Sequence, residues 1–188
     1  MPHMPHVLHQ RLKGIAAWLA LCMALAAGPA AAQGVELTTL QANRAEGVLS
    51  LDFAARITLP RAVEDALQRG VPVYFVASAD VFRPRWYWRD ERMARVVRTW
   101  RVVFQPLTST WRVSLGGLNQ SYPSLPDALT AISRGSNWKL MDPAPLDPGH
   151  YIEFSYRLDN SQLPSPMQIG LGGQAGWAVG IERVLRLE

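Results

Sequence analysis

Alternation of apolar and polar residues with a period of two is the feature that most constrains the fold of this chain. Over residues 48–58, every second position is apolar, namely Leu49, Leu51, Phe53, Ala55 and Ile57. Over residues 150–158, the same pattern comprises Ile152, Phe154, Tyr156 and Leu158. Successive side chains of a strand point to opposite faces of a sheet, so each segment predicts a strand with one buried face. A second, wetter face is typical of antiparallel sheets.

Further strands and two short helices are expected along the rest of the chain. Segments rich in valine, threonine and aromatic residues predict strands over 35–42, 71–81, 82–90, 91–104, 111–115, 137–141 and 177–187. The segment 91–104 also carries a helical stripe, but its valine and threonine content favours a strand. Proline near the start and glycine past the end predict helices over 60–68 and 125–134. The pattern predicts a mainly β fold, an antiparallel β-sandwich of about eight or nine strands with two short helices, with an open β-barrel as the alternative.

The first 32 residues have the layout of a secretory signal. Arg11 and Lys13 precede an apolar run of 13 residues over 15–27, and small residues, including Ala30 and Ala32, follow. A membrane-spanning helix needs roughly 20 apolar residues, so cleavage after Ala32 is favoured over retention as an anchor. We expect a single domain over 33–188 in the periplasm. The alternative is a protein held at the inner membrane by an uncleaved signal.

The composition of the expected mature chain excludes several kinds of site. Its one cysteine, Cys22, would leave with the signal, and His150 would be the only histidine left. Disulfides, thiolate nucleophiles and multi-histidine metal sites are then excluded. Two of the 19 basic residues and none of the 15 acidic residues lie in the signal, so 17 basic side chains remain against 15 acidic ones. So small an excess gives no reason to expect nucleic acid as a partner.

Arginine and aromatic residues alternate over 82–101, and this block is the candidate interaction surface. On paired strands it would present Arg83, Arg85, Trp86, Tyr87, Trp88, Arg89, Arg95 and Arg101. Arginine binds phosphate and carboxylate with a planar fork, and aromatic rings stack on guanidinium groups. The expected partner is an envelope protein or an anionic envelope component, such as a lipid head group or a glycan. The competing interpretation is a solvated strand face whose arginines pair with Asp90, Glu91, Glu153 and Glu182. Trp86 and Trp88 would mark an interaction patch if they are exposed.

No convincing catalytic, cofactor or metal site emerges from the residues. A set built on His150 with Asp142 or Asp147 would need a nucleophile, and no serine lies in a Gly-x-Ser-x-Gly elbow. His150 follows a proline–glycine turn, where an exposed histidine is expected. The two aspartates lie in ordinary Asp-Pro turn signals. The glycine-rich segment 170–176 lacks the Lys-Ser/Thr of a phosphate loop.

Two blocks of sequence resemble a known family. The first comprises WYWRDE (86–91), RTWR (98–101) and LTSTWRV (107–113), and the second is RLDNSQLPSPMQ (157–168). Together they resemble an exported proteobacterial family catalogued as domain of unknown function 4390. The resemblance covers essentially all of 33–188 and implies export and one β-rich domain, with no assigned activity. It also suggests genes that lie near a membrane sensor kinase of the nitrogen-regulation type.

These observations favour a non-enzymatic periplasmic binding or interaction module, with the extracytoplasmic part of such a kinase as one candidate partner. A hydrolase of unrecognised type using His150 or the aspartates, and an accessory protein for envelope stability, are the alternatives.

Overall fold

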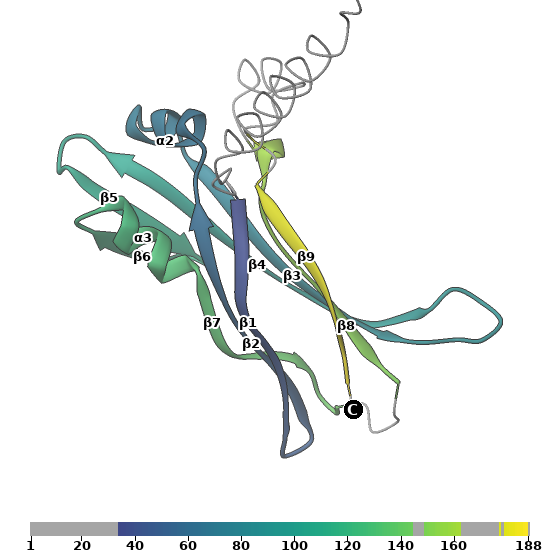
Figure 1. Cartoon of the computed structure of the whole chain (residues 1–188). Helices are drawn as coiled ribbons and strands as arrows, with labels where there is room; N and C mark the ends of the chain where they lie inside the picture. The colour runs from purple at the N-terminus through teal and green to yellow at the C-terminus, as the bar shows by residue number, and fades with distance from the viewer. Residues whose placement is uncertain (1–33, 145–148, 163–176, 178, 188) are drawn as a thin grey trace, which may run out of the picture. The chain divides into compact units, whose positions relative to one another are not determined.

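A computed structural model describes residues 34–144, 149–162, 177 and 179–187. Residues 33–188 form one compact unit. The described part of 33–188 contains nine strands, two α-helices and a short 3-10 helix (Figure 1). The elements are β1 (Gly34–Ala45), β2 (Val48–Thr58), α2 (Arg61–Gln68), β3 (Val73–Arg83), β4 (Glu91–Gln105), β5 (Thr110–Leu115), β6 (Leu118–Tyr122), α3 (Leu125–Ile132), β7 (Arg134–Met141), β8 (Tyr151–Leu158), η1 (Asn160–Gln162) and β9 (Gly180–Arg186).

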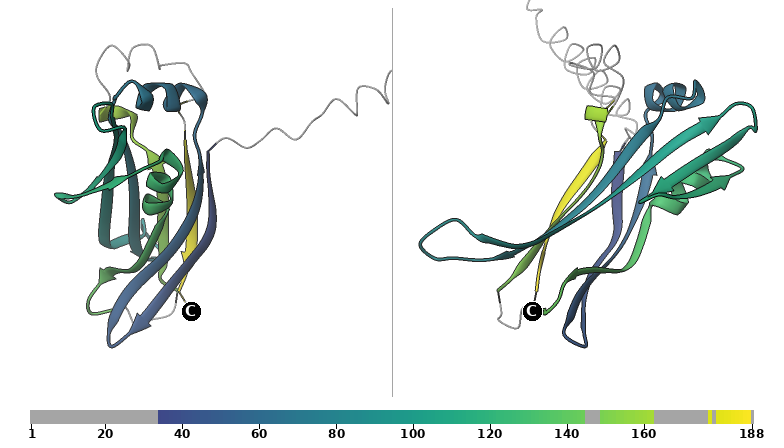
Figure 2. Two further views of the ribbon diagram at one scale, coloured as in Figure 1. Left: turned by 90° about the vertical axis from the view of Figure 1, so that its left-hand side faces the viewer. Right: turned by 180° about the vertical axis from the view of Figure 1, so that it is seen from behind.

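The strands form two antiparallel sheets that face each other (Figure 2). One sheet has the order β1-β2-β7, and the other has the order β6-β5-β4-β3-β8-β9. The strand β1 packs beside β9 at one edge, but no backbone ladder joins the two sheets among the described residues. The predicted antiparallel sandwich is therefore confirmed, and the described strands do not close into a barrel.

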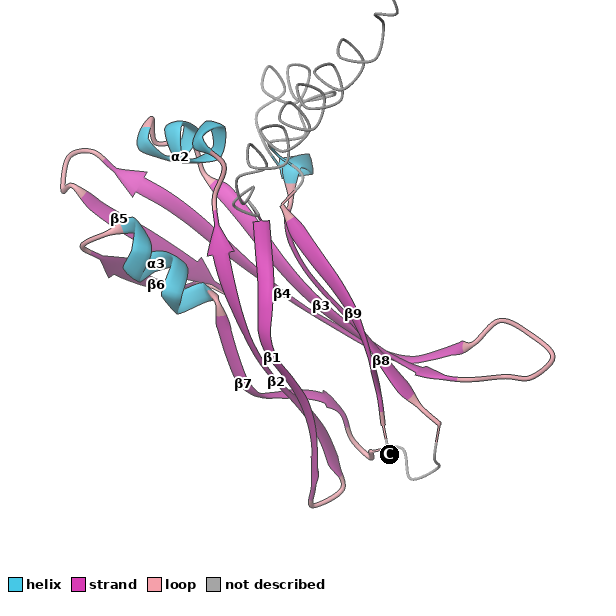
Figure 3. Ribbon diagram, in the orientation of Figure 1, coloured by secondary structure: helices cyan, strands magenta, loops and turns pink. Residues whose placement is uncertain are grey.

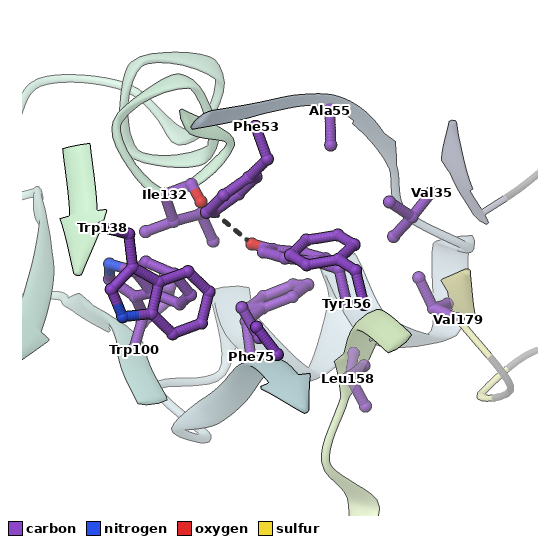
Figure 4. Packing of buried hydrophobic residues seen from close by; sticks show 14 of the residues in the cluster. Val35, Phe53, Ala55, Phe75, Trp100, Ile132, Trp138, Tyr156, Leu158 and Val179 are labelled. Atoms are coloured by element: carbon purple, nitrogen blue, oxygen red, sulfur yellow. Dashed lines mark hydrogen bonds between the residues drawn. The ribbon is translucent and has the colours of Figure 1, made fainter. Parts of the chain in front are cut away.

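The core lies between the sheets and is built on the ring of Phe53 (Figure 4). From β2, this ring contacts Phe154 of β8 with the ring centroids 5.1 Å apart, and Tyr156 of the same strand at 6.0 Å. It also meets Trp138 of β7 at 6.1 Å and Trp100 of β4 at 6.4 Å. The alternating positions predicted to be buried on β2 and β8 provide this contact, because one face of each strand is turned towards the opposite sheet.

Two polar side chains, those of the buried Tyr156 and the partly buried Arg98, point towards this apolar core. The Tyr156 hydroxyl donates to the backbone carbonyl of Ile132 at 3.1 Å, and burial raises the pKa of that hydroxyl well above its usual range. Arg98 lies among the inward positions of β4, where the alternation alone gives no reason for a charge. Its guanidinium carbon lies 4.8 Å from the centre of the Trp138 ring, so a cation–π contact accommodates the charge.

The two helices close parts of the sandwich that the sheets leave open. The helix α2 follows Pro60 and buries Val63, Ala66 and Leu67, as predicted. The helix α3 packs against β5, β6 and β7, where the three-stranded sheet does not reach the far strands of the larger one. Its cap is Ser124, whose hydroxyl accepts from the backbone N–H of Asp127 at 3.2 Å.

Two predictions about elements need correction, and one strand was not predicted. The segment 82–90 is not a strand of its own, because β3 continues to Arg83 and residues 84–90 form a loop. The edge strand β6 was not predicted, since its three central residues are polar and four of its five residues are exposed. The last strand begins at Gly180, and Trp177 and Val179 are buried ahead of it. The strand over 91–104, in contrast, is confirmed as β4.

Candidate functional site

The predicted interaction block lies mainly at the end of the β3–β4 hairpin. The ladder between the two strands ends at the pair Arg83–Glu91, and residues 84–90 connect them. We call residues 83–91 the hairpin tip. In Figure 3, and in the rear view of Figure 2, the tip stands clear of the other strands. It is thus a convex protrusion, unlike the flat strand face that the sequence predicted.

Three consecutive aromatic side chains are exposed at the hairpin tip. Trp86 is 94% exposed, Tyr87 67% and Trp88 73%. Trp86 and Tyr87 meet edge to face, with ring centroids 5.1 Å apart and planes at 70°. Large apolar side chains scattered singly over a surface are ordinary, but adjacent aromatic rings at one exposed point are a mark of an interaction site.

The carboxylate of Asp90 holds the loop in place through two hydrogen bonds, with Arg85 and with Tyr151, which we call the brace. One oxygen accepts from the backbone N–H of Arg85 at 3.1 Å, and the other accepts from the hydroxyl of Tyr151 at 2.7 Å. The Tyr151 ring in turn stacks on Phe82 of β3, with centroids 5.3 Å apart. The loop therefore has a defined shape despite its exposure, because its ends are tied to each other and to β8.

The same contacts shift two pKa values in opposite directions. The hydrogen bonds from Tyr151 and from the Arg85 backbone stabilise the charged carboxylate, so they lower the pKa of Asp90. The hydrogen bond to Asp90 stabilises the protonated phenol and, with some burial and the charges of Asp90 and Glu153, raises the pKa of Tyr151 to about 12. At neutral pH the brace is a phenol that donates to a carboxylate.

The arginines of the hairpin tip differ in how they are paired. Arg85 forms an ion pair and hydrogen bond with Glu91, and Arg83 lies 3.6 Å from the same carboxylate. Arg89 is exposed and has no ion pair or hydrogen bond with any residue that the structure describes. Of the four carboxylates predicted to pair with these arginines, Glu91 alone forms ion pairs with them among the described residues, and Arg89 is left available.

Two predicted members of the surface, Arg95 and Arg101, do not join the hairpin tip. Arg95 lies on the outer face of the six-stranded sheet, with its Nε 3.8 Å from Oδ1 of Asp80. Arg101 is ten residues along β4 from Glu91, about 30 Å at the rise of an extended strand. The structure therefore places six of the eight predicted residues at the hairpin tip and the other two along β4, because the chain turns at 84–90 and β4 runs away from the turn.

The outer face of the six-stranded sheet also has a shallow groove of about 600 Å³. Ser78 and Ser155 lie opposite each other on β3 and β8, and their hydroxyls are hydrogen-bonded at 2.8 Å. Asp80 is the most buried charge here, with its side chain 12% exposed, and Arg92 and Arg95 neutralise it at 3.6 and 3.8 Å. The sequence did not single out this groove, and its most buried charge, Asp80, is paired with arginines of the neighbouring strand.

The structure describes two of the three residues considered for hydrolysis, His150 and Asp142. His150 is 1% exposed, so its predicted exposure is wrong. The backbone N–H of Leu187, the residue after β9, donates to the His150 carbonyl at 2.8 Å. This hydrogen bond joins the end of β9 to the residue just before β8. Asp142 is exposed and pairs with Lys139 at 2.8 Å. Asp147 and the glycine-rich segment 170–176 lie outside the described residues.

The described residues contain neither a metal-binding cluster nor a membrane-spanning helix. Among them, no group of three or more His, Cys, Asp or Glu side chains is placed to hold a metal ion. None of the helices in this part of the chain has both the length and the apolar character needed to cross a membrane.

Comparison with known proteins gives a family and nothing more specific. Searches of curated proteins and of solved structures each found no match to the chain. The family described as "Domain of unknown function (DUF4390)" matches residues 32–186, which confirms the resemblance of the sequence blocks. This match spans all nine strands, and it includes the hairpin tip. The chain therefore belongs to the DUF4390 family.

Proposed function

We propose that this protein is a non-enzymatic binding module of the periplasm that docks on an envelope partner through its hairpin tip. The observation that carries the proposal is the exposure of Trp86, Tyr87 and Trp88 at the end of a braced hairpin. These rings contribute little to the core, so their exposure is best explained by contact with a partner. The signal-like layout of residues 1–32 supports the assignment to the periplasm.

Binding through a braced tip agrees with how recognition sites are generally built. A side chain already held in its binding geometry loses less conformational entropy when it binds. Asp90 provides this support through Arg85 and Tyr151, while the sandwich behind the hairpin supplies a rigid base. Tryptophan, tyrosine and arginine, which form the tip, are also the residues enriched at binding hot spots.

The test is photo-crosslinking in living cells with a photoreactive amino acid at position 87. The matched control places it at Leu107, which is fully exposed in the turn at the other end of β4. We expect a discrete adduct from position 87 and none from position 107. Equal adducts from both positions, or none from either in exported protein, would contradict docking through the tip.

Analysis of the adduct identifies the partner. A protein adduct would direct attention to envelope proteins, including the extracytoplasmic part of a membrane sensor kinase that the family resemblance suggests. A lipid adduct would instead identify the anionic component itself. Cell fractionation of the same samples tests the periplasmic assignment, since a cytoplasmic chain would contradict it.

A further inference from the structure

The chemistry of the hairpin tip favours one kind of partner over the others. Two of its three exposed rings are tryptophan and the third is tyrosine, with no exposed leucine, isoleucine or phenylalanine in the loop. Tryptophan and tyrosine combine an apolar ring with a polar N–H or O–H, and they gather at the boundary between lipid tails and water. Their joint presence at one protruding point matches the head-group region of a bilayer.

The charge of the hairpin tip complements an anionic surface. Three arginines, Arg83, Arg85 and Arg89, stand against two carboxylates, those of Asp90 and Glu91. Asp90 is occupied by Arg85 N–H and the Tyr151 hydroxyl, and Glu91 is shared by two arginines. Arg89 is left to bind an outside anion, and a guanidinium binds phosphate oxygens in bidentate fashion.

The shape of the hairpin tip also favours a bilayer surface as the partner. Its rings lie on a convex loop that stands clear of the sandwich (Figure 3). A protein partner would need a matching concave pocket to cover three adjacent rings on such a loop. A bilayer surface yields around an inserted loop, and the brace through Asp90 lets the loop enter without rearrangement.

We infer that the hairpin tip inserts Trp86 and Trp88 into the head-group region of an anionic phospholipid bilayer, with Arg89 against a lipid phosphate. The inference rests on the proposed function, since it names the partner of that same docking site. Tyr87, in edge-to-face contact with Trp86, lies between the two indoles in the sequence and enters the same region.

The experiment is co-sedimentation of the full chain, as cells produce it, with vesicles of phosphatidylglycerol and phosphatidylethanolamine. Vesicles of phosphatidylcholine alone serve as the uncharged comparison. We expect the Trp86→Ala/Trp88→Ala double variant to bind the anionic vesicles roughly tenfold more weakly or worse, because the buried ring area is lost. Arg89→Gln is expected to weaken binding about fivefold, the effect of one basic residue near an anionic surface.

Two matched control variants distinguish binding through the hairpin tip from non-specific binding to vesicles. Leu107→Ala removes an equally exposed apolar side chain from the opposite turn, and Arg61→Gln removes an exposed arginine from α2. Both are expected to bind like the unaltered chain. Every comparison is between variants of one chain, so any contribution from residues 1–32 is common to all of them.

The outcomes decide between the inference and the function on which it rests. Loss of vesicle binding confined to the tip variants supports both. Absence of vesicle binding, or equal binding by all variants, overturns the lipid inference. If position 87 still crosslinks to a protein in cells, docking through the tip stands with a protein partner. If it crosslinks to nothing, both proposals are wrong.

Discussion

The molecule has two clusters of aromatic side chains, one in the core and one at the hairpin tip, and both contain tryptophan and tyrosine. Around Phe53, the rings of Trp100, Trp138, Phe154 and Tyr156 are each less than 5% exposed. At the tip, every ring is at least two-thirds exposed. The core rings join two sheets, whereas the tip rings join nothing within the described chain. Residue type therefore does not separate folding residues from binding residues here, but position in the hairpin does.

The polar groups of the two regions also differ in whether they have partners within the protein. In the core, the Tyr156 hydroxyl is satisfied by a buried backbone carbonyl, and Arg98 by the face of Trp138. At the tip, hydrogen bonds shape the loop but leave Arg89 without a partner among the described residues. A buried polar group without a partner is costly, so these two core groups are held by internal contacts, whereas an exposed charge at the tip does not need one.

The largest expected effect comes from removing the central ring of the core. Phe53→Ala should lower the free energy of unfolding by about 3–5 kcal/mol, because it leaves a cavity between the two sheets. Denaturant unfolding monitored by circular dichroism measures this loss. Leu107→Ala, the exposed counterpart, should change it by less than about 0.5 kcal/mol. A loss under about 1 kcal/mol for Phe53→Ala would mean that the core does not depend on this ring.

An intermediate effect is expected from the brace at the tip, and it depends on pH. The folded-state pKa of Tyr151 is raised from 10.0 to about 12, so the brace contributes stability below pH 10 and loses it as the pH rises through about 12. The pKa of Asp90 is lowered, so the contribution of that carboxylate is present above its ordinary pKa of 3.8 and lost as the pH falls below it.

Tyrosinate absorbance measures the alkaline half of this prediction. The difference between the unaltered chain and Tyr151→Phe isolates the titration of Tyr151 from that of the other tyrosines. In an Asp90→Asn background, the midpoint should fall from about 12 towards 10.0, because the charged acceptor is gone. An unchanged midpoint would show that Asp90 does not hold this phenol in solution.

The smallest expected effect on stability comes from the exposed rings themselves. The Trp86→Ala/Trp88→Ala variant should unfold within about 0.5 kcal/mol of the unaltered chain, since surface substitutions away from packed features rarely change stability more. The same denaturant measurement as for Phe53→Ala gives a direct contrast. A loss above about 1 kcal/mol would assign these rings a folding role and weaken the case for a binding site.

The sequence correctly predicted which side chains are buried where burial depends on the period of a strand. It did not where burial depends on contacts between distant parts of the chain. The alternation around Phe53 and Tyr156 identified core faces, because neighbouring side chains of a strand must point in opposite directions. The same alternation around Trp86 and Trp88 indicated a strand and was misleading, because residues 84–90 connect β3 to β4. His150 was also misplaced, since contact with Leu187 depends on the pairing of β8 with β9.

The sequence by itself determined the antiparallel sandwich, the two helices, the family and the residue types of the candidate site, because these depend on local periodicity and motifs. Tertiary structure decided that six of the eight predicted surface residues lie at one protruding tip while Arg95 and Arg101 lie elsewhere on β4. It also supplied the brace between Asp90 and Tyr151, which are 61 residues apart in the chain. Strand pairing brings such residues together, and the period of a single strand shows which of its faces is buried but not which strand lies beside it.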